Sequence, residues 1–150
     1  MKRILLLVAS ACALALAGCS ADTTTSNWLK YTAWTADLAG KVCSDGQRSG
    51  TIEQGSINLR FSAMGYTMGY EYKVDGVSTK GIVKAFIFPD YSFPELYFHF
   101  PYKSEQGEEL EVSSTGIISS DQKSIHFDNF VVGYYPSSGF TSIEDVDFVR

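Results

Sequence analysis

Residues that commonly carry out chemistry are scarce in this chain. Its 150 residues include two histidines, three cysteines and four prolines. A structural zinc site, which needs four Cys or His ligands, is therefore not expected. The sequence contains no Gly-x-Ser-x-Gly motif, no phosphate-binding loop and no dinucleotide-binding glycine pattern. We expect no catalytic residues, no metal and no cofactor. A hydrolase built on carboxylates or on His126 is the less favoured alternative.

Positive charge is also in short supply. The chain has 12 Lys and Arg against 17 Asp and Glu, a net charge of −5. Lys2 and Arg3 are among the basic residues, so the chain without residues 1–18 carries a charge of about −7. Nucleic-acid phosphates require a basic face, so nucleic acid is not an expected partner. The same balance argues against an electrostatic grip on anionic lipid headgroups.

The longest apolar run is too short to span a membrane. It extends from Ile4 to Ala17, about 14 residues where about 20 are needed. Lys2-Arg3 precedes it, and the small residues Ala17-Gly18 close it before Cys19. A basic start, a short apolar run and small residues are the layout of a secretory signal. This layout predicts that residues 1–18 are a cleaved signal peptide.

Leu16-Ala17-Gly18-Cys19 resembles the lipobox of bacterial lipoproteins, and the resemblance covers residues 1–19. In that family the cysteine thiol is diacylated and the signal is cut just before it. The resemblance implies that Cys19 is lipidated and that its acyl chains hold the protein at a membrane of the bacterial cell envelope. By the family's sorting habit, Ser20 suggests the outer membrane, on its periplasmic or surface face. An ordinary signal that happens to be followed by cysteine is the alternative.

The rest of the chain is predicted to form a tether and one domain. Residues 19–27 comprise the lipidated cysteine and a polar tether, of which the eight residues after Cys19 extend at most ~28 Å. Residues 28–150 are long enough for a single β domain with its own core. Cys43 would be the one thiol left there, so no intramolecular disulfide is expected, and we interpret it as a small buried apolar residue.

Apolar and polar residues alternate with period two along most of this domain. Such alternation, with many aromatic and β-branched residues, is typical of half-buried strands. Asp75-Gly76 separates two of the runs and suits a two-residue type I′ turn. The predicted strands are residues 50–63, 66–74, 77–88, 95–103, 108–118, 124–135 and 141–149.

The stretch from Trp28 to Val42 is ambiguous. Trp28–Trp34 could be an eighth strand followed by a helical turn over Ala36–Val42, or the whole stretch could be one amphipathic helix. In either case the short connections predict an all-β fold, an antiparallel meander of 7–8 strands. A small closed or nearly closed barrel removes the exposed edges of such a meander. It would resemble the architecture of lipocalin-like barrels, although their Gly-x-Trp motif is absent. A two-sheet β-sandwich is the alternative.

Our first hypothesis for function is a non-catalytic β-barrel binding module, and aromatic residues indicate where its ligand would bind. Alternation places Tyr70, Phe98 and Phe100 on the apolar faces of their strands, and Phe86 lies on a strand that is apolar on both faces. We expect these four to line the barrel interior and to contact a small amphipathic ligand there.

A second hypothesis is a protein-interaction or inhibitor lipoprotein that binds an envelope protein. Tyr91 and Phe93 lie in a proline-flanked loop. If they cluster with Tyr134 and Tyr135, they would form a partner-binding site. His99 and the pair His126 and Asp128 lie on polar strand faces, and we interpret them as surface residues.

Overall fold

The computed structural model describes residues 28–45, 47–103, 107–135 and 139–150. The side chains of residues 101–103, 109–110, 133–135 and 139–141 are not described. Residues 1–27, which include the predicted signal peptide, Cys19 and the tether, lie outside the described part. Among the described residues, no helix is long and apolar enough to cross a membrane.

The described part of the chain forms eleven strands and no helix. Every pairing between them is antiparallel, so the predicted all-β antiparallel fold is confirmed, although the described part has eleven strands where 7–8 were expected. The strands are β1 (Ala33–Asp37), β2 (Val42–Ser44), β3 (Ser49–Thr51), β4 (Gln54–Phe61), β5 (Tyr66–Val74), β6 (Val77–Ala85), β7 (Asp90–Ser92), β8 (Glu95–Lys103), β9 (Glu109–Ile118), β10 (Ser124–Tyr135) and β11 (Gly139–Val149).

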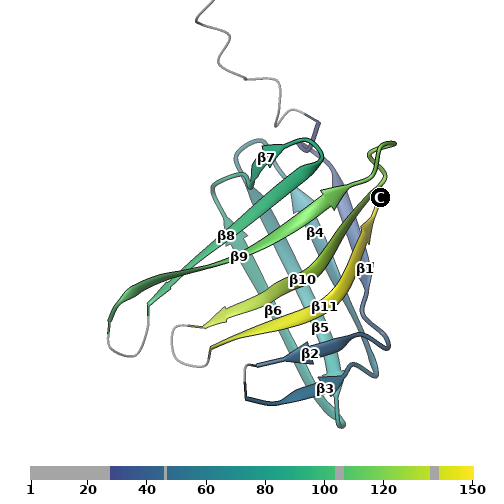
Figure 1. Cartoon of the computed structure of the whole chain (residues 1–150), viewed down its shortest axis with the longest axis vertical. Coiled ribbons are helices and arrows are strands. Elements are labelled where there is room, and N and C mark those ends of the chain that lie inside the picture. Colours follow the sequence, from purple (N-terminus) through teal and green to yellow (C-terminus); the bar gives the residue numbers. More distant parts are fainter. Residues whose placement is uncertain (1–27, 46, 104–106, 136–138) are drawn as a thin grey trace, which may run out of the picture.

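The sheet curls into a half-barrel (Figure 1). Its order is β6-β5-β4-β1-β11-β10-β9-β8-β7, and the short strands β2 and β3 extend from β11. The first strand therefore lies between β4 and the last strand, which brings the two ends of the meander together. Among the described strands, β6 pairs only with β5, and β7 pairs only with β8. The sheet thus keeps two edges that are not hydrogen-bonded to each other.

Several predicted strands match the structure at both ends, and the largest difference lies in residues 50–63. That predicted strand divides into β3 and β4 around Ile52 and Glu53. The Ile52 side chain is buried, and its backbone N–H donates to the carbonyl of Lys41 at 2.8 Å. Because Ile52 bonds to the turn after β1, the ladder is interrupted there. The strand predicted over 77–88 ends at Ala85, and the three-residue strand β7 was not predicted.

The stretch Trp28–Val42 contains a strand but no helical segment. Residues 28–31 form a turn, β1 occupies Ala33–Asp37, and a tight turn follows in which the N–H of Lys41 donates to the carbonyl of Leu38 at 3.0 Å. The strand expected over Trp28–Trp34 lies instead at Ala33–Asp37, and both the expected helical turn over Ala36–Val42 and the single-helix alternative are wrong. β1 pairs with β4 over five residues, and this ladder holds the segment extended.

The predicted Asp75-Gly76 turn is confirmed. Val74 pairs with Val77, so only two residues connect β5 to β6. Asp75 has a φ of 50° and Gly76 a φ of 77°, and two positive φ values define a type I′ turn. Glycine reaches this backbone conformation without the steric cost that a side chain brings.

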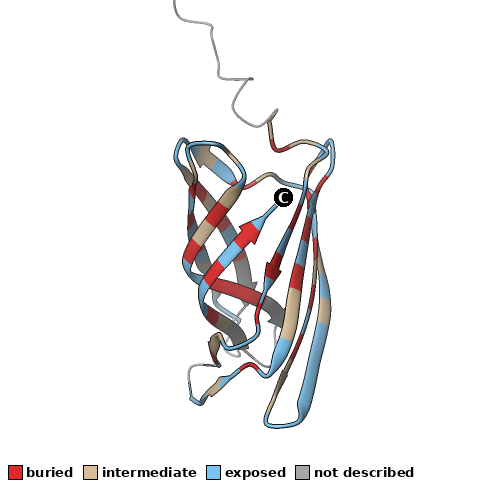
Figure 2. Cartoon of the chain, turned by 90° about the vertical axis from the view of Figure 1, so that its right-hand side faces the viewer, coloured by how far each residue is buried: buried red, intermediate tan, exposed pale blue. Residues whose placement is uncertain are grey.

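A core of aromatic and aliphatic side chains fills the space between the two walls of the half-barrel. Buried and exposed residues alternate along most strands (Figure 2). Phe98 is 0% exposed, and it joins the walls because it packs against rings from β4, β5 and β10. Centroid distances from the Phe98 ring run from 5.2 to 6.4 Å, to Phe61, Tyr66, Phe100, Phe127 and Phe130.

Candidate binding surfaces

The residues predicted to line the interior are largely placed as expected. Tyr70, Phe98 and Phe100 are buried and face inward. However, other rings occupy the space around them, and the Phe98 and Phe100 rings stack at a centroid distance of 6.1 Å. Burial raises the pKa of the neighbouring Tyr66 to about 12, so its phenol stays neutral. These side chains pack against one another as a core.

Phe86 does not line the interior, and this prediction is wrong. It follows the end of β6 and its side chain is 87% exposed. The alternation of strand 77–88 stops at Ala85, because the chain bends there toward β7. A ligand inside the half-barrel would therefore not contact Phe86.

The predicted partner-binding cluster does not assemble from its two parts. Ser92 lies beside Tyr91 and Phe93. The strand pairings across β8 and β9 place Ser92 at the same height in the sheet as His126 on β10. Tyr134 lies eight residues further along β10, a distance of about 27 Å in an extended strand. The side chains of Tyr134 and Tyr135 lie outside the described part. Tyr91 packs against Trp28 at 5.6 Å between ring centroids, while Phe93 is 51% exposed.

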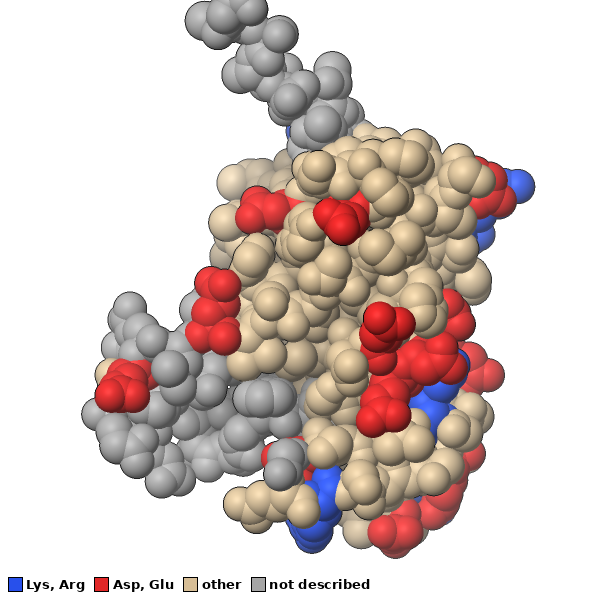
Figure 3. All heavy atoms as spheres, viewed as in Figure 1, with Lys and Arg blue, Asp and Glu red and all other residues tan. Residues whose placement is uncertain are grey.

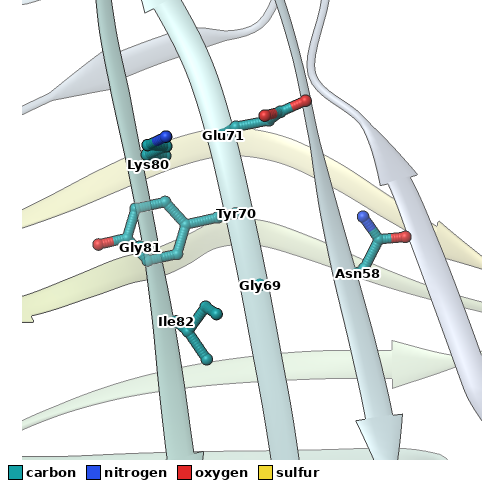
Figure 4. A pocket seen from close by; sticks show the side chains of 7 residues that line it. All are labelled: Asn58, Gly69, Tyr70, Glu71, Lys80, Gly81 and Ile82. Carbon is teal, nitrogen blue, oxygen red and sulfur yellow. The ribbon is translucent and has the colours of Figure 1, made fainter.

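A shallow depression of about 630 Å³ lies over the outer face of β4, β5 and β6 (Figure 4). Gly69 lies between Asn58 and Ile82 in the pairing register, and the missing side chain leaves this space open. Glu71 and Lys80 are opposite each other in the register at one end of it, and the Glu71 side chain extends toward β4. The sequence gives no signal for this depression, because its residues alternate with the buried ones, as on any solvent-exposed strand face.

Behind this depression the Tyr70 ring covers Gly81, its partner on the inner face (Figure 4). A Cβ at Gly81 would collide with that ring, whereas a Cβ at Gly69 would meet nothing within 4 Å. The two glycines therefore differ in role. Gly81 makes room for a core ring, and Gly69 keeps the outer surface hollow.

One edge of β6 presents unpaired backbone groups. Val74 and Val77 flank a two-residue turn, so they form a hydrogen-bonded pair and every second residue after Val77 bonds to β5. The intervening residues direct their N–H and C=O groups toward the free edge. These are Ser78, Lys80, Ile82 and Lys84. Among the described strands, none pairs with this edge.

His126 belongs to a charged network on the outer face of β10 and β11. Its Nδ1 lies 2.8 Å from Asp147 Oδ1, and its Nε2 lies 3.2 Å from Asp128 Oδ1. The hydrogen bond with Asp147 raises the pKa of His126, and the hydrogen bond from Lys41 to Asp145, at 2.8 Å, lowers the pKa of that carboxyl. Acidic side chains gather beside basic ones on this side of the molecule (Figure 3).

Ligand atoms of His126, Asp145 and Asp147 lie within 4.8 Å of one another, a spacing that a metal ion can use. The ammonium group of Lys41 already neutralises Asp145, however, and His126 bonds to Asp147. The carboxylates of Asp145 and Asp147 thus already have partners within the protein. Sequence analysis placed His126 and Asp128 on the surface, as observed, but had no signal for Lys41, which the pairing of β2 with β11 brings near Asp145.

His99 and Cys43 also lie where they were expected. His99 lies on the surface as predicted, where Nδ1 is 2.9 Å from Glu111 Oε1 and Nε2 is 3.3 Å from Asp90 Oδ2. Cys43 is buried in the core, and this burial raises the pKa of its thiol. A raised thiol pKa disfavours the reactive thiolate. This agrees with its interpretation as a small apolar core residue.

Comparison of the chain with protein-family models, with curated proteins and with solved structures gave no match in any of the three. The surfaces described above are therefore interpreted from their geometry alone.

Truncation of Phe98 distinguishes a filled interior from a hollow one. Phe98→Ala removes the ring that joins the two walls, and we expect it to lower the free energy of unfolding by about 3–5 kcal/mol in denaturant melts. Phe86→Ala is the matched control, since an exposed ring contributes within about 0.5 kcal/mol. A small loss of stability at Phe98, accompanied by loss of saturable binding of an apolar fluorescent probe, would contradict the filled core.

The His126 network predicts a dependence of stability on pH. The pKa of His126 is raised in the folded state, so its stabilisation is complete below the unfolded pKa of about 6.5. It disappears as the pH rises through the higher folded value. Since the side chain is 42% exposed, we expect a small effect. His126→Gln should lower the denaturation midpoint more at pH 5 than at pH 9. Equal losses at both pH values would show that the charge on His126 does not stabilise the fold.

Proposed function

We propose that this chain is a bacterial envelope lipoprotein, anchored by acyl chains on Cys19 at the outer membrane, with a non-catalytic interaction module as its β domain. Its partner would be an extended segment of an envelope protein that pairs with the free edge of β6. The observation that carries the proposal is that β6 has one unpaired edge beside a core that is already filled. The anchor rests on the resemblance of residues 1–19 to a lipoprotein signal.

The filled core favours this function over a ligand enclosed by the barrel. A pocket that encloses a small molecule typically has a volume of 300–1,000 Å³. Phe98 instead has five aromatic neighbours at contact distances, and Phe127 packs against Phe130 at 4.8 Å between centroids. A small amphipathic ligand would have to displace these rings. A surface partner requires no such rearrangement.

The edge of β6 provides what strand addition needs. Its outward N–H and C=O groups at alternate residues can form a ladder with a partner strand, which supplies affinity independent of sequence. The exposed side chains along it supply specificity. Lys80 and Lys84 flank the apolar Ile82 on the outer face. A complementary segment therefore has an apolar residue opposite Ile82 and acidic residues opposite the two lysines.

The same lysines make self-association through this edge unfavourable. Two copies of β6 paired edge to edge would bring Lys80 and Lys84 of both copies onto one face, and like charges on paired strands are destabilising. Lysine on an edge strand is a common protection against such pairing. The edge is thus protected against a second copy of itself but open to an acidic segment.

Site-specific photo-cross-linking in the bacterial envelope tests the proposal. A photoreactive residue at Ile82 should form an adduct in the membrane fraction, and one at Thr115 should not, because Thr115 lies on β9 between two paired strands. Lys80→Pro removes an outward N–H without breaking the ladder to β5, so it should abolish the Ile82 adduct. Lys80→Ala keeps that N–H and should reduce the adduct less.

Unfolding melts establish that each variant is folded. Adducts of equal yield at Ile82 and Thr115, or an Ile82 adduct that survives Lys80→Pro in a folded protein, would contradict pairing at this edge.

A further inference from the structure

Exposed apolar side chains are concentrated at one end of the domain. Nine large apolar side chains are exposed in the described part; Val77, Ile82, Ile117 and Val149 lie on strands, and the other five lie in loops. Tyr31, Met64, Phe86, Ile87 and Phe93 all belong to loops at this end, and we call them the tether-end rim. A cluster of this kind on a water-soluble surface marks an interaction site.

The loops that carry the rim are adjacent in space. The N–H of Phe61 donates to the carbonyl of Thr32 at 2.9 Å, which places the turn with Tyr31 beside the turn with Met64. A Cβ at Gly65 would meet backbone atoms of Ala85 and Ile87, so the Met64 turn also contacts the loop after β6.

Trp28 lies at this same end. Its ring is 5.6 Å from the ring of Tyr91, which precedes Phe93, and β7 lies at the upper end of the molecule in Figure 1. Residues 20–27 can extend at most ~28 Å. If Cys19 is acylated, as the proposed function holds, the bilayer surface lies within that reach of the rim.

The charge at this end also differs from that of the whole chain. Its described basic side chains are Lys30, Arg60, Lys84, Lys123 and Arg150, and its acidic ones are Asp90, Glu95, Asp121 and Asp147. This end is thus close to neutral, whereas the whole chain has a net charge of −5. Between the charges, most of the upper surface in Figure 3 is neither acidic nor basic. Aromatic and basic side chains together suit the headgroup region of a bilayer.

We propose that the tether-end rim rests in the headgroup region of the bilayer that holds the lipid anchor. This inference rests on the proposed function and adds an orientation to it. The strands then rise from the membrane, the Asp75-Gly76 turn points away from it, and the free edge of β6 stays accessible from the side. Apolar side chains that enter the interface add to the hold of the acyl chains.

Environment-sensitive fluorophores on the acylated full chain in phosphatidylethanolamine–phosphatidylglycerol vesicles test this orientation. Met64→Cys and Val77→Cys form a matched pair, because these side chains are 70% and 68% exposed but lie at opposite ends of the domain. The label at position 64 should shift to shorter wavelength and be quenched by brominated lipid. The fluorescence of the label at position 77 should keep the wavelength typical of water and should not be quenched by brominated lipid. Phe86→Glu combined with Ile87→Glu should reverse the shift at position 64.

Intact-mass measurement of the same samples separates this inference from the proposed function. An acylated chain whose two labels both report water overturns the rim contact and leaves the lipoprotein intact. If the chain carries no acyl mass, the lipid anchor is refuted. In that case the rim contact is supported only if added vesicles still shift the fluorescence of the label at position 64 to shorter wavelength. A shift that depends on protein concentration without vesicles indicates a second copy at the rim and overturns the inference.

Discussion

The packing of aromatic rings around Phe98 holds the two walls of the half-barrel together. The sheet leaves its edge strands β6 and β7 without a hydrogen-bonded connection among the described residues, so side-chain packing must replace the missing ladder. Phe98 on β8 contacts Phe61 and Tyr66 from the opposite wall and Phe130 from its own. Such edge-to-face and offset contacts contribute beyond simple burial of area. In the described part of the chain, aromatic rings fill the space around Phe98, and the candidate sites lie on the outer surface.

Period-two alternation was sufficient to predict most of this fold. Strands 66–74, 95–103 and 124–135 match at both ends, and Phe98 faces the core as its alternation indicated. Alternation fails where a strand bends. The N–H of Ile52 bonds to the turn after β1 instead of continuing the strand. Phe86 follows a bend that the periodicity of the sequence does not indicate.

The candidate sites were harder to predict, because they depend on register between strands distant in sequence. Lys41 meets Asp145 only because β2 pairs with β11, and the hollow at Gly69 exists only between its partners on β4 and β6. Sequence also places Tyr134 near the end of a predicted strand and Phe93 in a loop, without indicating that the two lie at opposite ends of the sheet. The proposal that this protein acts through its outer surface rests on the packed core, on the β6 edge that pairs with no described strand, and on the tether-end rim.

Amide hydrogen exchange along β6 is the most direct test of this account, because it reads the availability of each backbone N–H. The account predicts an alternating pattern. Thr79, Gly81 and Val83 bond to β5 and should exchange slowly, while Lys80 and Ile82 should exchange at nearly the rate of an unstructured chain. Slow exchange at all five positions would mean that another part of the molecule covers this edge, and it would contradict the central claim that β6 is open to a partner.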